Sequence, residues 1–220
     1  MARSTPTPAA TRDRLIEAAR YLFWEKGYAA TGLSDILARA NANSGSFYHF
    51  FESKDALLRT VLDTYVEMLH PVLIAPVRAK ARRPLDEVTE LLASYRQRLA
   101  GTGCTYGCPI GRLALEIDPE NTPAHALIAR NFDGWKAAVA DALTRAGVPE
   151  PADVAAFVLT VMEGAVMQAR AHRSLAPYDV CIRQLHAYLA TLTPSPSAGR
   201  PSRRRAARRR PARSSKRRSG

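Results

Sequence analysis

The stretch "NSGS", residues 43–46, combines an amide, two hydroxyls and a glycine in a pattern suited to holding nucleic acid. Asn43 can cap a short helix over residues 44–50, which leaves the residues after it on the exposed first turn. Small side chains on that turn let the backbone approach the wall of a DNA groove, and hydroxyls there can bond phosphates or base edges. The residues on the turn are Ser44, Gly45 and Ser46.

Ring-bearing side chains follow at once in "FYHFF", residues 47–51. Phe47 and Phe51 are about one helical turn apart, so both are expected to face a small core. Tyr48 and His49 then point outward with polar tips. A different interpretation is a helical hairpin with an ordinary aromatic core, and composition alone would favour it.

The residues before this helix complete the pattern of a helix-turn-helix, in which two short helices pack nearly at right angles across a tight turn. Thr31 or Gly32 can start the first helix, and Ala40 is small enough for close contact between the two helices. Asn41 can adopt the left-handed backbone conformation that the turn requires, although less readily than glycine. Lys54 adds a donor beside the positive end of the helix that follows.

The elements around this unit are predicted to be helices throughout, because no alternating strand pattern and no repeat occurs. A first helix is expected to stop at Gly27, and a later one, capped by Ser53 with Asp55 in its first turn, is expected to run to about Pro71. Further helices are predicted at roughly 85–100, 109–118, 122–147, 151–173 and 177–192.

The combination of these residues resembles the TetR/AcrR family of bacterial repressors. The matching residues are "EKGYAAT", Asp35–Ile36, Ala40, "SGSFYHFF" and "SKDAL", within about residues 12–58. The resemblance implies an all-α, nine-helix, dimeric protein with a DNA-reading head and a ligand-sensing body. It also implies phosphate contacts near Thr31, Asn43, Tyr48, His49 and Lys54, and base contacts from Ser44, Gly45 and Ser46. Gly32 belongs to the same expected DNA-binding set.

Three positions depart from the family pattern. Asn41 stands where the family usually has glycine, and Asn43 stands where serine is common. Both changes are chemically tolerable. Phe50 stands where histidine is usual, so the resemblance does not support a phosphate contact at that position.

A second candidate for chemistry is Cys108 in "YGCPIGRLALE". Pro109 suits the first position of a helix, so Cys108 is the expected cap, and Arg112 follows one turn later. Both features favour a reactive thiolate. The alternatives are a small, inert, buried cysteine and a pairing with Cys104. The segment resembles a motif of the LmrA/YxaF-like branch of the family, which includes electrophile-responsive regulators. No histidine or carboxylate cluster lies nearby, so no metal and no cofactor are predicted.

Aromatic and soft side chains recur along the middle helices. Each one singly is expected to belong to a core, but together they are enough to line an apolar cavity for a small-molecule effector. The predicted lining set is Tyr65, Met68, Tyr95, Leu99, Cys108, Leu113, Phe132, Trp135 and Met162.

The last two predicted helices carry apolar stripes that suit a homodimer interface, in which two helices from each copy form a four-helix bundle as in the family. The alternative is packing within one copy only. Gly164 and Ala165 would allow close approach of helices. The stripe residues are Val154, Phe157, Val158, Val161, Met162, Ala165 and Val166, then Ile182, Leu185, Leu189 and Leu192.

Composition sets the layout of the chain, with 46% hydrophobic residues and a net charge of +12. Residues 194–220 hold ten arginines, one lysine and no acid, so eleven of the twelve net charges lie there. We expect a flexible arm at 1–10, a helix-turn-helix domain at 11–54, a ligand-binding and dimerisation domain at 55–193, and a disordered tail at 194–220. The tail either contacts DNA or is a solubilising extension.

No secretory signal pattern is present, and "AAFVLTVMEGAVM" carries a glutamate and looks too short to span a bilayer, so a cytoplasmic protein with no membrane partner is expected. The leading hypothesis is a ligand-responsive transcriptional regulator, most simply a repressor, released from a near-palindromic operator by a small apolar or aromatic molecule. Alternatives are a repressor that senses electrophiles or oxidants through Cys108, and an architectural DNA-binding protein that uses the tail. An enzyme with Cys108 as nucleophile lacks any oxyanion or cofactor motif.

Overall fold

The structure, a computed structural model, describes residues 8–192, and within that range it contains helices and no strands. The all-α prediction is confirmed. Most of the predicted N-terminal arm and all of the arginine-rich tail lie outside the described residues.

Short connections join the helices along the described part of the chain. They are α1 (Pro8–Glu25), α2 (Leu33–Ala40), α3 (Ser44–Phe50), α4 (Lys54–Met68), η1 (Leu69–Ile74), α5 (Ala75–Lys80), α6 (Pro84–Gly101), α7 (Pro109–Glu116), α8 (Thr122–Arg145), α9 (Pro151–His172) and α10 (Ala176–Leu192). The π-helical segment η1 joins α4 to α5 without a break. Counted as one rod, these three give nine helices in the described part of the chain, as predicted.

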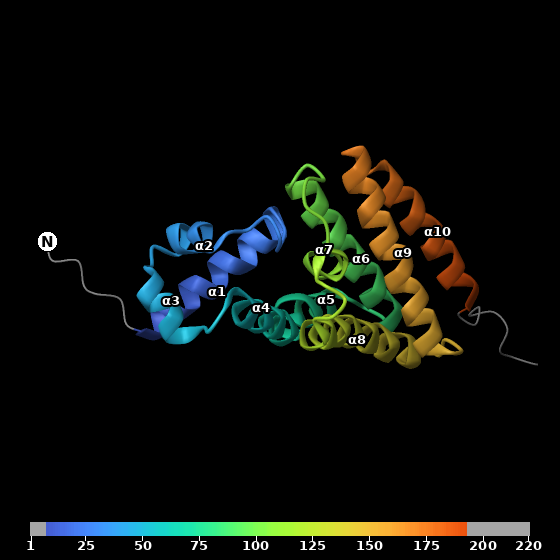
Figure 1. The fold of residues 1–220 in the computed structure, drawn as a ribbon. Helices are drawn as coiled ribbons and strands as arrows, with labels where there is room; N and C mark the ends of the chain where they lie inside the picture. Colours follow the sequence, from blue (N-terminus) through green and yellow to red (C-terminus); the bar gives the residue numbers. More distant parts are fainter. Residues whose placement is uncertain (1–7, 193–220) are drawn as a thin grey trace, which may run out of the picture.

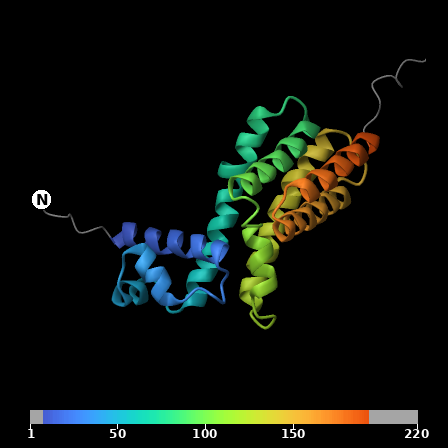
Figure 2. The same ribbon diagram turned by 90° about the horizontal axis from the view of Figure 1, so that it is seen from above.

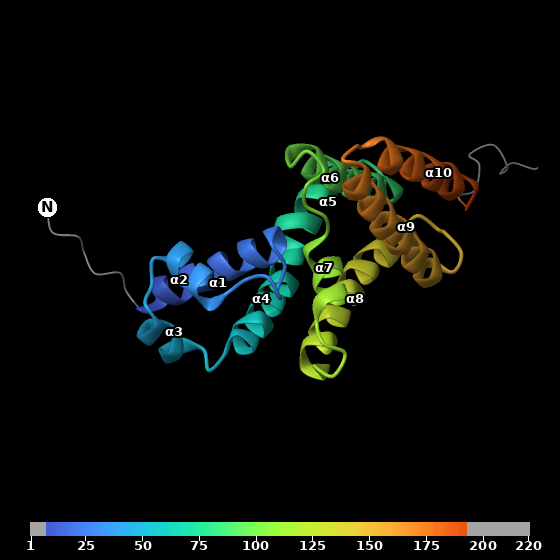
Figure 3. The ribbon, with the colours of Figure 1, turned by 45° about the horizontal axis from the view of Figure 1, so that its top comes forward.

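The helices form two parts joined by α4 and α7. We call α1, α2 and α3 the head, and α6, α8, α9 and α10 the body; Figure 1 places the head at one end and α10 at the other. Figure 2 shows α4 running from the head to the body, where it packs against α8. α7 lies at the junction and contacts both α1 and α8 (Figure 3). A movement of α7 would therefore change contacts with both the head and the body.

The rod that begins at Lys54 does not end at Pro71, and this prediction is wrong. Proline within an α-helix clashes with the carbonyl four residues earlier and has no N–H to donate. Here the turn around Pro71 widens into a π-helix, in which Ala75 N–H donates to His70 O, five residues back. The wider turn accommodates the proline ring, so the helix continues to Lys80.

Two clusters of buried side chains hold the parts together. The head cluster contains Phe23 and Phe47, and it extends along α4 as far as Leu62. It also includes Leu113 from α7, which is 1% exposed. α7 therefore packs with the head, although in sequence it lies between two helices of the body. The predicted domain boundary at residue 54 remains a prediction.

The apolar stripes of α9 and α10 are used mainly inside one copy, which corrects the predicted interface. Val158 is fully buried and Leu189 is 2% exposed, because α9 packs on α8 and α10 packs on α9. Phe157, in contrast, is 47% exposed. The stripe residues buried in this way are Val154, Val158, Met162, Ala165, Val166, Ile182, Leu185 and Leu189.

α9 is also longer than the apolar stretch that predicted it. It has 22 residues, and its most apolar 18-residue window has a mean hydropathy of 1.4, enough by length and composition alone to cross a bilayer. The predicted stretch, residues 155–167, is by itself too short to span one, and the helix extends beyond it at both ends. In the structure the buried side of α9, which includes Met162, forms part of the body core.

Candidate nucleic-acid interface and ligand cavity

The turn between α2 and α3 is fixed by two asparagines. Asn41 has φ 47° and ψ 55°, the left-handed conformation predicted for it, and its N–H donates to the carbonyls at the end of α2. Asn43 caps α3, because its Oδ1 accepts a hydrogen bond of 2.7 Å from Ser46 N–H. Both local predictions are confirmed, and together they set the direction in which α3 leaves the turn.

The outward surface of α3 consists of small and polar side chains. Ser44 and Gly45 are exposed, Ser46 is half-buried, and Tyr48 is 60% exposed. His49 is also exposed. On the inward side the predicted residues, Phe47 and Phe51, are buried with ring centroids 5.7 Å apart.

Two residues expected at phosphates have their polar atoms bonded within the protein. Thr31 is fully buried, and its hydroxyl donates to Gly27 O at 2.6 Å, so a phosphate contact through this hydroxyl is excluded. Lys54 Nζ donates to Tyr28 O at 2.9 Å and to Thr31 O at 3.0 Å. Burial lowers the pKa of Lys54. Gly32 remains exposed, with its N–H donating to Asp35 Oδ2 at 3.1 Å.

Two exposed arginines of the head escaped the sequence reasoning. Arg39, near the end of α2, lies 3.6 Å from the ring centroid of Tyr21. Arg12, on α1, lies 5.7 Å from the ring centroid of Phe51. Their stacking fixes two positive charges on the head. Nothing in their spacing separated them from ordinary solvent-exposed arginines.

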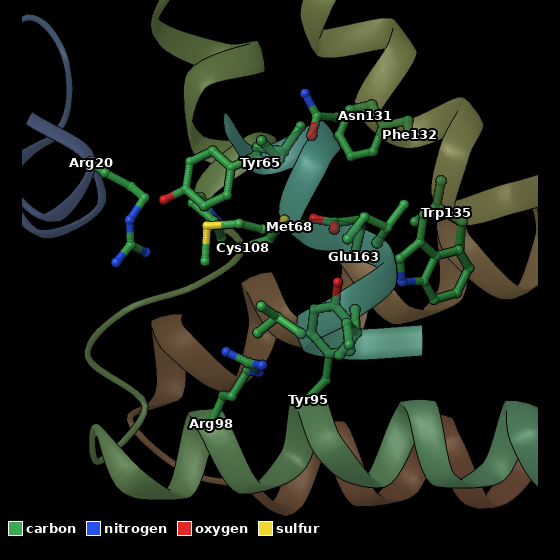
Figure 4. A pocket seen from close by; sticks show the side chains of 16 residues that line it. Arg20, Tyr65, Met68, Tyr95, Arg98, Cys108, Asn131, Phe132, Trp135 and Glu163 are labelled. Carbon is green, nitrogen blue, oxygen red and sulfur yellow. The ribbon is translucent and has the colours of Figure 1, made fainter. Parts of the chain in front are cut away.

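A cavity of about 160 Å³ lies between α4, η1, α6, α7, α8 and α9, with Arg20 reaching it from α1. Figure 4 shows the side chains that line it. Six residues of the predicted set are among them: Tyr65, Met68, Tyr95, Cys108, Phe132 and Trp135.

The other three predicted lining residues lie elsewhere. Leu99 lines an adjoining chamber of about 120 Å³, which shares Tyr95 and Cys108 with the cavity. Leu113 belongs to the head core and Met162 to the body core, each nearly or fully buried. Helical spacing marked all three as apolar but could not say which core they face.

The polar lining residues were missed by sequence reasoning. They are Arg20, Arg98, Asn131 and Glu163. Glu163 carried a signal, since a carboxylate inside a long apolar helix is unusual, but it was used only as an argument against a membrane span. Among the described residues, no group of three histidine, cysteine or acidic side chains could hold a metal ion.

Cys108 caps α7 as predicted, with its Sγ accepting a hydrogen bond of 3.4 Å from Gly111 N–H. Of the two alternatives for this sulfur, its surroundings favour the inert thiol over the reactive thiolate. Burial and the nearby carboxylate of Glu163 raise the pKa of Cys108 well above its ordinary value. Arg112 points instead toward the end of α1. None of the three cysteines is in a disulfide, so the alternative of a Cys104–Cys108 pairing is not formed, and Cys104 is buried.

The C-terminal half of α7 is hydrogen-bonded to the main chain at the end of α1. Arg112 Nε pairs with Glu116 Oε1 at 2.6 Å, and its other nitrogens donate to the carbonyls of Glu25 and Lys26. Glu116 Oε2 accepts from Tyr28 N–H at 2.7 Å. We call this pair and its main-chain partners the α7 clamp. One short helix thus touches the cavity through its first residues and the head through its last.

Close packing at the clamp explains a glycine and fixes the loop before α7. Gly27 has φ 94°, and a side chain there would collide with Glu116 and Arg112. Nearby, Trp24 Nε1 donates to Gly107 O at 2.8 Å. α1 is therefore held to α7 and to the loop that precedes it by hydrogen bonds rather than by apolar contact alone.

Sequence comparisons give two matched segments, one that includes most of the head and one that covers most of the body. Residues 15–61 match the family described as bacterial regulatory proteins, tetR family. Residues 84–184 match the family described as transcriptional regulator LmrA/YxaF-like, C-terminal domain. An uncharacterized HTH-type transcriptional regulator of Mycobacterium tuberculosis is 31% identical over 194 residues, covering 84% of this chain and 97% of that protein. The HTH-type transcriptional repressor NemR of Escherichia coli K12 is 26% identical, covering 82% and 94%.

Solved structures share the architecture. The reduced form of Escherichia coli NemR superposes with a TM-score of 0.72 at 24% identity, covering 85% of this chain and 99% of that one. The regulatory protein TetR from Rhodobacter sphaeroides gives a TM-score of 0.73 at 23% identity, covering 81% and 98%.

Proposed function

The chain belongs to the TetR family of bacterial regulatory proteins, and from that premise we propose that it is a ligand-responsive transcriptional repressor. As a cytoplasmic homodimer it binds a near-palindromic operator in double-stranded DNA through its two heads. A small aromatic molecule in the cavity lowers DNA affinity by favouring a spacing of the heads that misfits the operator. The observation that carries the proposal is the capped, exposed polar turn at the start of α3.

Gly45 supports the assignment of this turn to DNA. A Cβ built at Gly45 would meet only Asn43 Oδ1, at 3.4 Å, so the fold itself tolerates a side chain there. Close approach of the helix to a groove wall would not tolerate one. We assign base contacts to Ser44, Gly45 and Ser46, which surround this point.

Phosphate contacts are assigned to polar groups around the turn that remain available. Asn43 keeps its amide N–H₂ for a phosphate, since only its oxygen is used in the cap. Tyr48 and His49, on α3, and Arg39, near the end of α2, are also exposed. Lys54 takes a supporting role, because its ammonium group bonds the two carbonyls of the loop before α2.

The exposed face of α9 and α10 is the proposed contact between two copies. Phe157 and Tyr188 touch across the two helices with centroids 5.4 Å apart, and they are 47% and 41% exposed. A Cβ at Gly164 would meet nothing within 4 Å, so the fold of one copy does not require glycine there. Close approach of a helix from a second copy would require it. Uncharged residues at helical spacing continue this face: Ala156, Thr160, Val161, Gln168, Gln184, Ala187 and Thr191.

The repressor is distinguished from an architectural protein by selecting bound DNA from a random pool with the full chain. We expect one near-palindromic sequence with half-sites about one helical turn apart, or a near multiple. Ser44→Ala and Ser46→Ala should change the preferred bases, whereas Tyr48→Phe should weaken all sequences alike, since phosphate contacts carry no sequence information. Enrichment of no sequence would refute the proposal, and equal losses on every sequence for the serine variants would refute the assignment of base contacts.

A thiol-sensing repressor is a second candidate, favoured by the position of Cys108 in the cavity wall. Against it stands the environment of the sulfur, because burial beside a carboxylate keeps the thiol protonated. We therefore favour a ligand that binds the cavity without forming a covalent bond.

A further inference from the structure

Two buried polar atoms on the cavity wall have no hydrogen-bond partner among the described residues. One is Oε1 of Glu163, and the other is Nε1 of Trp135, a side chain that is 3% exposed. The carboxyl oxygen can accept a hydrogen bond, and the indole N–H can only donate one. Because buried polar groups are normally satisfied, an unpaired acceptor and an unpaired donor in one cavity indicate a polar group from outside the chain.

Apolar and aromatic surface surrounds these two atoms. Figure 4 shows Glu163 near the middle of the cavity, with Trp135 to one side and the hydroxyl of Tyr95 directed toward the carboxyl group. Phe132 and Met68 contribute further apolar wall. A molecule that fits this space needs an aromatic body and a small polar group that reaches Glu163 and Trp135.

The charges around the cavity argue against a cation as that polar group. Arg20, which pairs with Glu17 at 2.6 Å, and Arg98 both line it, and they would repel a further positive charge. An ammonium ion could also satisfy only Glu163, since it has no lone pair for the N–H of Trp135. A hydroxyl can donate to the carboxyl oxygen and accept from the indole, so it satisfies both.

We propose that the cavity binds an aromatic molecule that carries a hydroxyl group, placed between Glu163 and Trp135. This inference rests on the proposed function for the location of the effector and adds the chemical class of its polar group. An apolar cavity of roughly 150 Å³ holds one benzene molecule. The cavity of about 160 Å³ and the adjoining chamber of about 120 Å³ together therefore suit one or two rings.

The test is calorimetric titration of the full chain with 2-naphthol and with naphthalene, which differ by one hydroxyl. We expect 2-naphthol to bind at least about tenfold more tightly, because it forms two hydrogen bonds that naphthalene cannot form. Glu163→Met keeps the side-chain volume but has no carboxyl oxygen, and it should reduce the preference to within about threefold. Trp135→Phe should reduce it as well. Met68→Leu, which reshapes the same cavity without removing a polar atom, should retain it.

Folding of the key variant can be checked independently. Burial raises the pKa of Glu163, so its ionised form is costly in the native state at neutral pH. Glu163→Met should therefore have a melting temperature no lower than that of the native chain, and loss of 2-naphthol binding would not reflect unfolding. A melting temperature well below that of the native chain would mean that the carboxyl group has a structural partner, which contradicts the inference.

The outcomes separate this inference from the proposed function. Equal affinity for 2-naphthol and naphthalene, with operator release by both, would overturn the hydroxyl assignment and leave the repressor intact. Tighter binding of 2-naphthylmethylammonium would assign Glu163 to a cation and overturn it too. Absence of binding by every probe would overturn the cavity as an effector site, and with it this inference, whereas operator selection would still test the head.

Discussion

The DNA-reading turn and the ligand cavity are built in opposite ways. The turn is made by consecutive residues, 41–51, whose polar side chains face solvent and whose shape is set by two asparagines. The cavity is made by side chains from six helices and η1, from Arg20 to Glu163, and two of its polar atoms, Glu163 Oε1 and Trp135 Nε1, are buried without partners. The first is a local surface suited to a large partner. The second is assembled from residues far apart in the sequence and is suited to a small molecule.

This difference shows where regulation has to act. A turn held by its own caps cannot easily change shape, so a ligand in the cavity has to move the head as a unit. The α7 clamp connects the two regions directly, because the cavity wall at Cys108 and the grip on α1 at Arg112 belong to one short helix. The head is therefore expected to respond as a rigid unit to events in the body.

The largest expected effect separates the core of the body from its outer face. Leu189 is 2% exposed and its neighbour Tyr188 is 41% exposed. Leu189→Glu buries a carboxylate and should cost roughly 3–5 kcal/mol, enough to unfold much of the body. Tyr188→Glu should change the stability of one copy by less than about 0.5 kcal/mol, yet give folded monomers that lose operator binding. Sedimentation and urea unfolding measure both.

The outcome for Tyr188→Glu decides the interface. A dimer of unchanged affinity for the operator would place the contact between copies on another face. A Tyr188→Phe variant serves as the matched control, since it keeps the ring against Phe157 and removes only the hydroxyl. It should remain dimeric.

The arginine-rich tail is an expected source of DNA affinity that belongs to neither the turn nor the cavity. Residues 194–220 lie outside the described residues but carry a charge of +11. About five phosphate contacts from each copy would add roughly 4.5 per copy, or about 9 for the dimer, to the slope of log affinity against log salt. Truncation after Thr193 should flatten that slope on operator and random DNA alike, while operator preference and dimerisation remain. Identical slopes for both chains would show that the tail has no role at DNA.

The contrast between the two regions also explains what the sequence could predict. Asn41 in the left-handed conformation, the Asn43 cap and the burial of Phe47 were all predicted, because each depends on residues within one turn. Six of the nine predicted cavity residues line the cavity, but helical spacing could not tell that Leu113 faces the head core. It also could not tell that Glu163 faces inward among aromatic rings.

Predictions of features that depend on residues far apart in the sequence failed for the same physical reason. The stripe through Val158 and Leu189 was predicted to join two copies, since sequence shows that a face is apolar without showing which partner covers it. The expected end at Pro71 failed because a π-helical turn, unlike a cap, has no simple sequence signal. The α7 clamp joins residues more than eighty positions apart and had no local signature.

A third prediction tests the clamp as the link between the regions. Arg112→Met removes the donors to the last turn of α1 and should reduce the coupling between cavity and DNA, roughly 1–3 kcal/mol in a working regulator, to near zero. Affinity of the cavity for 2-naphthol should stay the same. Operator affinity measured with and without ligand gives the coupling. Arg83→Met, which removes an exposed pair of 2.8 Å with Asp86 away from the head, is the control. Full coupling in Arg112→Met would mean that the signal travels through α4 instead.

The smallest expected effect is at Cys108, which lines the cavity and caps α7. Burial and the carboxyl group of Glu163 raise the pKa of this thiol, so at pH 7 to 8 it stays protonated in the native state. The native chain thus holds its proton to higher pH than the unfolded chain. Any stability gained in this way is present below the ordinary thiol pKa and is lost as pH rises through the native one.

At pH 8, alkylation of Cys108 by iodoacetamide should accordingly be slow in the native protein and fast in urea, followed by mass spectrometry of the peptide. Cys108→Ser should leave operator release by 2-naphthol unchanged within about twofold, because the ligand needs no bond to sulfur. Release by an electrophile from the native chain, but not from Cys108→Ser, would reverse this conclusion. It would show that the cavity acts through the thiol at the start of α7 and that burial does not protect it.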